Sequence, residues 1–375
     1  MSNALLHRTL QLAALGRTLS PPNPAVGCVI CDAHGHILGE GHTQAVGGPH
    51  AEIVAMRSAA AQGHALTGAT AYVSLEPCAH HGRTGPCCDA LAAAGIQQVV
   101  AISMDPNPQV AGQGFARLRA AGVQVRVLPT DDPLVVQARE LNIGFFSRML
   151  RKTPWVRMKV AASLDGRTAL NNGVSQWITA EAARADGHAM RARACAVLTG
   201  IGTVLADNPQ LNVRAIQTNR QPHLVLVDSR LETPLDARLF DVARTLYIYA
   251  AVVDDAKKAA LEARGATVIH LPGTQDNTQH KVDLAAMLRD LARREVNEVH
   301  VEAGHKLNGS LLRAGLVDEL VTYLAPKLVG DGSGMAQLAP LTDLTGALQL
   351  NFHAVDRVGP DLRIVARFDG RGHFS

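Results

Sequence analysis

Three candidate zinc ligands and one carboxylate dominate the first quarter of this chain. His50 lies two residues before Glu52, and Cys78 and Cys87 each follow a proline. Catalytic zinc sites hold the ion with three protein ligands and leave the fourth position for water. A histidine two residues before a glutamate, with cysteines after a proline, is also the pattern of zinc-dependent deaminases. The sequence therefore predicts hydrolytic removal of an amino group from a nitrogen heterocycle.

Each residue type fits a step of that chemistry. Zinc lowers the pKa of bound water from about 15.7 toward about 7, so hydroxide forms at neutral pH. Glu52 can take that proton, pass it to the ring nitrogen and later protonate the leaving ammonia. A lone histidine is most often a solvated loop residue, and the cysteines alone fit a structural zinc knuckle. A closed structural site needs a fourth ligand and leaves Glu52 without a role, so the catalytic site is favoured.

The predicted elements bring these residues to two helix ends. A loop at 47–49 leads into a helix predicted over 51–61, and Pro86 suits the first turn of a helix over 86–94. The positive ends of two helix dipoles would then face one site and favour thiolates over thiols. Cys88 is expected to pack within its helix, because adjacent cysteines rarely bind one tetrahedral ion.

Composition narrows the classes of partner and the compartment. The 375 residues favour two domains, and the net charge of +3 is not gathered into a basic cluster. Aromatic residues make up only 3% of the chain, so stacking surfaces for nucleic acid are scarce. The sequence shows neither an apolar run long enough to span a membrane nor a signal-peptide core. Six cysteines are too few for a disulfide scaffold, so we expect a cytoplasmic protein. From the charge, the aromatic content and the lack of an apolar span, we expect that it binds neither nucleic acid nor membranes.

The hydrophobic pattern predicts a mixed α/β protein in two domains. In the first half we expect a hairpin over 26–30 and 37–39, strands over 69–75, 99–103 and 123–128, and helices over 51–61, 86–94 and 115–121. A basic, proline-containing joint precedes a strand over 155–161, so we place the domains at 1–149 and 150–375. Later strands are predicted over 196–199, 223–228, 245–250, 267–270, 298–301 and 320–324.

Four motifs occur in the order in which one known family carries them. They are PNPAVGCVI at 22–30, EPCAHHGRT at 76–84, DPNP at 105–108 and KVAASLDGRTA at 159–169. The step from Cys78 to Cys87 is also longer than the two-residue gap of nucleoside and nucleic-acid deaminases. The chain resembles the bifunctional deaminase/reductases of riboflavin biosynthesis over nearly its whole length.

This resemblance implies the fold, the cofactors and the substrate. It implies an N-terminal cytidine-deaminase-like domain with zinc and a C-terminal dihydrofolate-reductase-like domain with NADPH. The substrate would be 2,5-diamino-6-ribosylamino-4(3H)-pyrimidinone 5′-phosphate, a phosphorylated pyrimidine that loses its 2-amino group. NADPH-dependent reduction of the ribosyl chain would then give 5-amino-6-(5-phosphoribitylamino)uracil. Relatives also imply a homo-oligomer.

In the first domain, two further residues are candidates for substrate binding. Arg83 could hold the phosphate through charge-assisted hydrogen bonds, although an ordinary polar loop explains it equally well. Asn23 stands between two prolines, where it could contact the pyrimidine or ribose, or could simply form a turn.

The second domain lacks a Rossmann fingerprint, but glycine-containing turns follow two predicted strands, at 199–203 and 302–309. Matching the family's motifs implies NADPH contacts from Ala161, Trp177, Thr203, Asp207, Ser229 and the Gly304 loop. The same matching implies substrate contacts from Ser175, Arg191, Leu211, Arg214 and Glu302. Arg191 and Arg214 suit phosphate recognition, although many surface arginines are only solvated.

Reducing the ribose requires that its ring opens, so an acid or base is needed beside the hydride donor. Lys159 and Glu302 are the candidates, and a strand-end ion pair is the competing explanation. Two other functions stay open. A nucleic-acid deaminase with an RNA-binding module is disfavoured by the sparse aromatics and low charge. A deaminase fused to a cofactor-sensing domain would bind NADPH without turnover.

Overall fold

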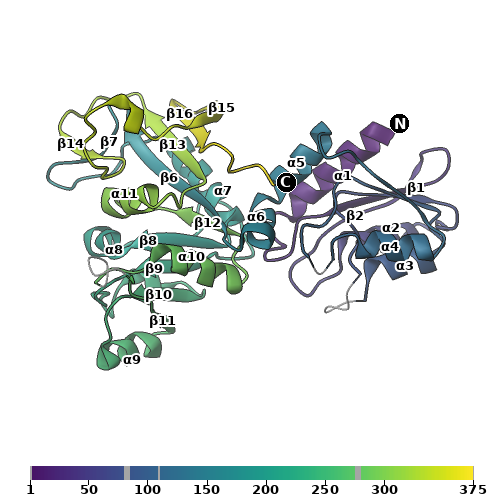
Figure 1. The fold of residues 1–375 in the computed structure, drawn as a ribbon, viewed down its shortest axis with the longest axis horizontal. Helices are drawn as coiled ribbons and strands as arrows, with labels where there is room; N and C mark the ends of the chain where they lie inside the picture. The colour runs from purple at the N-terminus through teal and green to yellow at the C-terminus, as the bar shows by residue number, and fades with distance from the viewer. Residues whose placement is uncertain (1, 80–84, 109, 275–279, 375) are drawn as a thin grey trace. The chain divides into compact units, whose positions relative to one another are not determined.

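The computed structural model describes residues 2–79, 85–108, 110–274 and 280–374. The chain divides into two compact units, Met1–Lys152 and Thr153–Ser375. Each unit is built on its own main sheet, as Figure 1 shows. Among the described residues, no helix combines the length and the apolar character needed to cross a membrane.

Unit 1 contains a five-stranded sheet in the order β2-β1-β3-β4-β5. β1 pairs antiparallel with β2 and β3, whereas β3, β4 and β5 run parallel. The strands are β1 (Gly27–Cys31), β2 (Ile37–His42), β3 (Thr70–Val73), β4 (Gln98–Ala101) and β5 (Gln124–Val127). The helices are α1 (Ser2–Gly16), α2 (Ala51–Ala61), α3 (Cys87–Ala93), α4 (Gln113–Ala120), α5 (Pro133–Leu141) and α6 (Ile143–Arg151). The predicted strands and helices of this half are confirmed, while α1, α5 and α6 were not predicted.

Two glycines of β2 allow α2 to lie directly against the sheet. A Cβ on Gly39 would come within 2.3 Å of the Ala55 carbonyl oxygen, and one on Gly41 within 2.4 Å of that of Ala51. Real side chains do not tolerate such distances, so only glycine permits this approach. The packing fixes the first turn of α2, which carries Glu52, beside the end of β2.

Unit 2 contains a nine-stranded sheet in the order β11-β10-β9-β8-β12-β6-β13-β16-β15 and a two-stranded sheet of β14 and β7. The strands from β11 to β13 are parallel, and β16 and β15 extend the sheet antiparallel. The strands are β6 (Trp155–Ser163), β7 (Arg167–Leu170), β8 (Ala196–Gly200), β9 (His223–Val227), β10 (Leu246–Ala250), β11 (Ala266–His270), β12 (Glu298–Val301), β13 (Glu319–Ala325), β14 (Gly332–Gly334), β15 (Asn351–Val358) and β16 (Asp361–Arg367).

The α-helices of unit 2 mostly connect the parallel strands, as expected for this kind of sheet. They are α7 (Glu181–Arg193), α8 (Ile201–Asp207), α9 (Asp255–Ala263), α10 (Leu284–Arg293) and α11 (His305–Arg313). The six predicted later strands and the strand at 155–161 are confirmed, whereas β7, β14, β15 and β16 were not predicted. The carboxyl ends of β8, β12 and β6, which are neighbours, bring their following segments together at one edge of the sheet.

Candidate active sites

The three predicted zinc ligands of unit 1 converge. The ligand atoms of His50, Cys78 and Cys87 all lie within 4.8 Å of one another. His50 Nδ1 is 3.6 Å from Cys78 Sγ and 3.4 Å from Cys87 Sγ. One imidazole nitrogen and two sulfurs at this spacing form a donor set that zinc prefers, and three ligands leave a tetrahedral position open.

Two helix starts and the segment after one strand supply this group. His50 is the N-cap of α2, Cys87 is the first residue of α3, and Cys78 lies in the segment after β3. The Cys87 backbone N–H donates to Cys78 Sγ at 3.4 Å. Hydrogen bonds from Cys87 and from His50 lower the pKa of the Cys78 thiol, which favours a thiolate in this group. Cys88 lies outside the group, and its thiol is directed to Asp89 Oδ1 at 3.5 Å.

Glu52 is buried in the first turn of α2, two residues from the candidate ligand on the same helix end. Burial and the nearby Cys78 raise the pKa of Glu52 to about 7. A carboxyl group that gains and loses its proton near neutral pH is suited to carry a proton in both directions.

The other candidates in unit 1 have different outcomes. The backbone N–H of Asn23 donates to the Ser20 carbonyl oxygen at 2.8 Å, which supports a turn at this position. Its contact with substrate stays a prediction. Arg83 lies outside the described residues. Sequence reasoning missed Glu76, whose buried carboxylate accepts backbone hydrogen bonds from four residues after β4.

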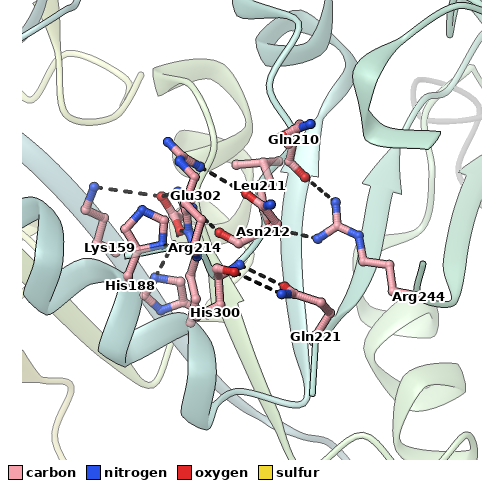
Figure 2. A network of polar contacts seen from close by, with 12 residues as sticks. Lys159, His188, Gln210, Leu211, Asn212, Arg214, Gln221, Arg244, His300 and Glu302 are labelled. Atoms are coloured by element: carbon pink, nitrogen blue, oxygen red, sulfur yellow. Dashed lines mark hydrogen bonds and ion pairs between the residues drawn. The ribbon is translucent and has the colours of Figure 1, made fainter. Parts of the chain in front are cut away.

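In unit 2 the predicted acid/base pair lies within a larger ion cluster (Figure 2). Glu302 follows β12, and its Oε2 is 3.8 Å from Lys159 Nζ of β6. Arg191 of α7 binds both oxygens of Glu302, one of them at 2.8 Å from Nη2. His300 of β12 is completely buried, with Nε2 3.4 Å from Glu302 Oε1. Two cations and an imidazole therefore surround one carboxylate.

The pKa values of the carboxylate and the lysine in this cluster are both lowered, for different reasons. Burial opposes the charge of Glu302, but Arg191 and Lys159 outweigh it and lower its pKa well below the usual value. Burial lowers the pKa of Lys159, and Glu302 only partly restores it. Glu302 is therefore an anion at neutral pH, whereas Lys159 is the group whose proton is more readily lost than that of an ordinary lysine.

The segment between α8 and β9, together with His188 of α7 and Arg244 before β10, adds further members of the network in Figure 2. Arg191 Nη1 donates to the Asn212 carbonyl oxygen at 2.9 Å, and Arg214 Nη1 donates to Asn212 Oδ1 at 3.1 Å. The backbone N–H of Arg214 is 3.4 Å from His188 Nδ1. The Leu211 carbonyl oxygen accepts a hydrogen bond from Arg244 at 2.7 Å. Lys159, Arg191, Leu211, Arg214 and Glu302 are thus brought into one network.

Ser175 lies in the segment between β7 and α7, and its contact with substrate stays a prediction. His188 and His300 were missed, although each has a signal in the sequence. His188 is three residues before Arg191 on one helix, and His300 is two residues before Glu302, so each pair shares a face. Burial and the nearby Arg191 lower the pKa of His188 to about 4, so it is neutral at pH 7.

The predicted cofactor residues follow neighbouring parallel strands. Thr203 and Asp207 lie on α8 after β8, Ser229 lies just after β9, and Gly304 precedes α11 after β12. A Cβ on Gly304 would be 4.0 Å from Thr203 Oγ1, so these two turns lie side by side. Ala161 lies on β6. The exposed Trp177 stacks under Arg184, whose guanidinium carbon is 4.6 Å from its ring centroid.

Comparisons with known proteins identify both halves of the chain. The family described as the cytidine and deoxycytidylate deaminase zinc-binding region matches residues 2–103, and the RibD C-terminal domain matches residues 154–364. Riboflavin biosynthesis protein RibD of Escherichia coli is 44% identical over 371 residues, covering 95% of this chain and 96% of that protein. The same protein of Haemophilus influenzae is 40% identical, covering 96% of this chain and 95% of its own length.

Solved structures show the same fold over the whole chain. RibD of Acinetobacter baumannii is 36% identical with a TM-score of 0.86, covering 97% of this chain and 98% of that one. The deaminase/reductase of Thermotoga maritima is 31% identical with a TM-score of 0.82, covering 97% of each chain. The predicted cytidine-deaminase-like and dihydrofolate-reductase-like domains are confirmed. The chain belongs to the RibD family, the bifunctional enzymes of riboflavin biosynthesis that join a zinc-dependent deaminase domain to an NADPH-dependent reductase domain.

Proposed function

We propose that His50, Cys78 and Cys87 hold the catalytic zinc ion and that Glu52 is the acid and base of the deamination. The convergence of the three ligand atoms beside a buried carboxylate is the observation that carries this proposal. The substrate is 2,5-diamino-6-ribosylamino-4(3H)-pyrimidinone 5′-phosphate, which loses the amino group at position 2. Bound zinc would lower the pKa of a water molecule, so that hydroxide is available as the nucleophile at neutral pH.

The residues of the chain carry the proton through this reaction. Glu52 accepts a proton from the attacking water and gives it to the ring nitrogen, which makes the attacked carbon more electrophilic. It then takes the second proton from the added hydroxyl group and delivers it to the departing amino group, which leaves as ammonia. The raised pKa of Glu52 supports both transfers, because neither protonation state is strongly preferred near pH 7.

Removal of zinc separates the two activities. After chelation and dialysis, we expect ammonia release from the diaminopyrimidine to fall to background and to return when one equivalent of zinc is added. NADPH oxidation with the already deaminated intermediate should be unchanged, because the reductase cluster contains no proposed zinc ligand. Full ammonia release by the zinc-free chain would refute the proposed deaminase site.

We propose that the ion cluster of unit 2 binds the phosphorylated ribosyl chain and positions it for reduction by NADPH. Lys159, Arg191 and Arg214 place three cations near the single carboxylate of Glu302. Burial and Arg191 lower the pKa of Arg214, so a bound anion would relieve the repulsion between the two guanidinium groups. We assign the phosphate to Arg191 and Arg214, with Leu211 and Ser175 as further substrate contacts.

The acid/base work in this site is assigned to Lys159. When the ribose ring opens, Lys159 donates a proton to the ring oxygen, and the resulting imine carbon accepts a hydride. Glu302 remains ionised beside Arg191, so it orients Lys159 and the sugar and does not donate a proton. The ion pair between Lys159 and Glu302 is thereby part of the catalytic arrangement.

The residues after β8, β9 and β12 fit NADPH. No side chain caps α11, and Gly202 leaves open space where a Cβ would stand, so backbone N–H groups of these described turns are accessible to a phosphate. Bound NADPH supplies the hydride. We assign its contacts to Ala161, Trp177, Thr203, Asp207, Ser229 and the Gly304 loop.

Arg214→Met tests the phosphate assignment. A hydrogen bond to a charged group contributes about 1.5–3 kcal/mol, so KM of the reductase for its phosphorylated substrate should rise about 10- to 150-fold. The KM for NADPH and the deaminase kinetics should stay within about twofold. Steady-state kinetics with varied intermediate provides the measurement, and Arg289→Met on α10 serves as a matched control. An unchanged KM would remove Arg214 from the phosphate site.

We also propose that the chain is a homo-oligomer that works in the cytoplasm. The exposed edge strand β15 and the segment before it carry several exposed apolar side chains, namely Leu338, Leu341, Leu344, Leu348, Phe352 and Val355. Such a surface is typical of a protein interface. None of the six cysteines, all of them within described residues, forms a disulfide, which supports a reducing compartment. A monomeric mass at micromolar concentration by sedimentation equilibrium would contradict the oligomer.

A further inference from the structure

Glu76 lies two residues before Cys78, and its buried carboxylate accepts four backbone hydrogen bonds. Oε2 accepts the N–H groups of Asp105 and Gly112 at 3.3 and 3.0 Å. Oε1 accepts those of Gly114 and Phe115 at 3.0 and 3.3 Å. An ionised carboxylate has about four acceptor positions, so these donors use all of them. Glu76 therefore has no free acceptor for a substrate.

Both oxygens bind the start of α4. Oε2 accepts from its N-cap, Gly112, and also from Asp105 after β4, whereas Oε1 accepts from two residues of its first turn. The N-cap of α4 is Gly112, at φ +77° and with no side chain to act as a cap. The first N–H groups of a helix need acceptors from outside it, and Glu76 supplies them from a distant part of the sequence.

The first turn of α4 also packs closely against the backbone that precedes Cys78. A Cβ on Gly114 would stand 2.0 Å from the Pro77 carbonyl oxygen and 3.3 Å from Glu76 Cγ. The glycine thus allows α4 to contact the Glu76–Cys78 segment directly. Arg117 of α4 also donates to the Ala79 carbonyl oxygen at 2.7 Å.

We propose that Glu76 is a positioning residue of the deaminase site. By binding the start of α4 and the backbone of Asp105, it fixes the backbone of Cys78 so that its sulfur faces His50 and Cys87. This inference rests on the proposed function, because it takes Cys78 as a zinc ligand. Some residues hold a metal ligand in place without binding the metal themselves. Replacing such a residue typically lowers metal affinity or activity by about 10- to 100-fold.

Glu76→Gln in the full chain tests the proposal. The glutamine has the same size, but its NH₂ group would face two backbone donors. We expect zinc affinity, measured by competition with a chromophoric chelator, to fall about 10- to 100-fold. We also expect the visible absorption spectrum of the cobalt-substituted protein to change, because that spectrum reports the thiolate geometry. The thermal unfolding curve of the full chain, compared with that of the wild type, reports whether unit 1 remains folded.

Two further variants separate positioning from general stability. Leu118→Ala removes a buried side chain of the same helix, so it should lower the thermal midpoint but keep the wild-type zinc affinity and cobalt spectrum. Glu76→Asp keeps the charge and both oxygens on a shorter side chain, and it should show a smaller loss of zinc affinity than glutamine. It also serves as the test if Glu76→Gln does not fold.

The outcomes distinguish this proposal from the zinc assignment on which it rests. Wild-type zinc affinity and cobalt spectrum in the folded Glu76 variants would overturn the positioning role. An equal loss of affinity in Leu118→Ala would overturn it as well, since the effect would then be one of stability. If Cys78→Ser binds zinc as tightly as the wild type, the ligand assignment itself fails, whatever the Glu76 variants show.

Discussion

Glu52→Gln is expected to lower kcat for deamination by about 10²- to 10⁴-fold, the usual contribution of a general acid or base. The amide has the size of the carboxyl group but cannot carry a proton between water, ring and leaving group. Because Glu52 is not one of the three converging ligands, the zinc content should remain at one ion per chain. Ammonia release under saturating substrate, together with metal analysis of the same sample, provides the measurement.

The control for this variant is Glu40→Gln. Glu40 is a carboxylate on β2 that pairs with the partly exposed Arg8, and surface ion pairs contribute little to stability. Its deaminase kcat should stay within about twofold of the wild type. The reductase kcat should be unchanged in both variants. A Glu52→Gln enzyme that keeps more than a tenth of the wild-type deaminase kcat would exclude Glu52 as the proton carrier.

Lys159→Met is expected to lower kcat for reduction by about 10²- to 10⁴-fold and to change its pH dependence. Burial lowers the pKa of Lys159 from the usual 10.5, and a proton donor must be protonated to act. Wild-type reductase activity should therefore fall as the pH rises through an apparent pKa below 10.5. The variant should lack this alkaline decline. Profiles of kcat against pH, followed by NADPH absorbance, provide the test.

A strand-end ion pair makes a different prediction for the same variant. If Lys159 only balanced the charge of Glu302, its loss would lower stability but leave kcat and the alkaline decline intact. Lys258→Met, at an exposed position of α9, is the matched control and should behave as the wild type. A Lys159→Met enzyme with wild-type kcat and an unchanged profile would remove the acid role.

Short-range patterns explain why much of the deaminase site was predictable from sequence. His50 and Glu52 stand at a helix start, and Cys87 follows a proline at another, so local rules brought them close to their observed places. The start of α4 was predicted two residues late, at 115. The N-cap residue of α4 has no side chain to accept the first N–H groups of the helix. Glu76, a residue far away in the sequence, supplies the acceptor oxygens instead. Local capping rules could not reveal that contact.

The reductase site depends more on long-range contacts. Its residues come from β6, α7, the segment before β9 and the end of β12. They meet only because the sheet order places β12 between β8 and β6. The family's motifs predicted roles for Arg191, Arg214 and Glu302, but they did not reveal the neighbouring groups that shift the pKa values of these residues. His300 is a buried histidine beside a carboxylate, and burial of this kind is decided by the packing of the whole sheet. The edge strand β15 and its neighbour β16 lacked a sustained hydrophobic alternation and escaped prediction for that reason.

The ligand shell of the bound zinc tests the central claim most directly. X-ray absorption of the zinc-loaded chain should show two sulfurs and one imidazole nitrogen, with an oxygen from water as the fourth neighbour. Cys88→Ser should leave that shell unchanged, whereas Cys78→Ser should remove one sulfur. A shell with three sulfurs, or with four protein ligands and no water, would identify a closed structural site and contradict a zinc-dependent deaminase built on His50, Cys78 and Cys87.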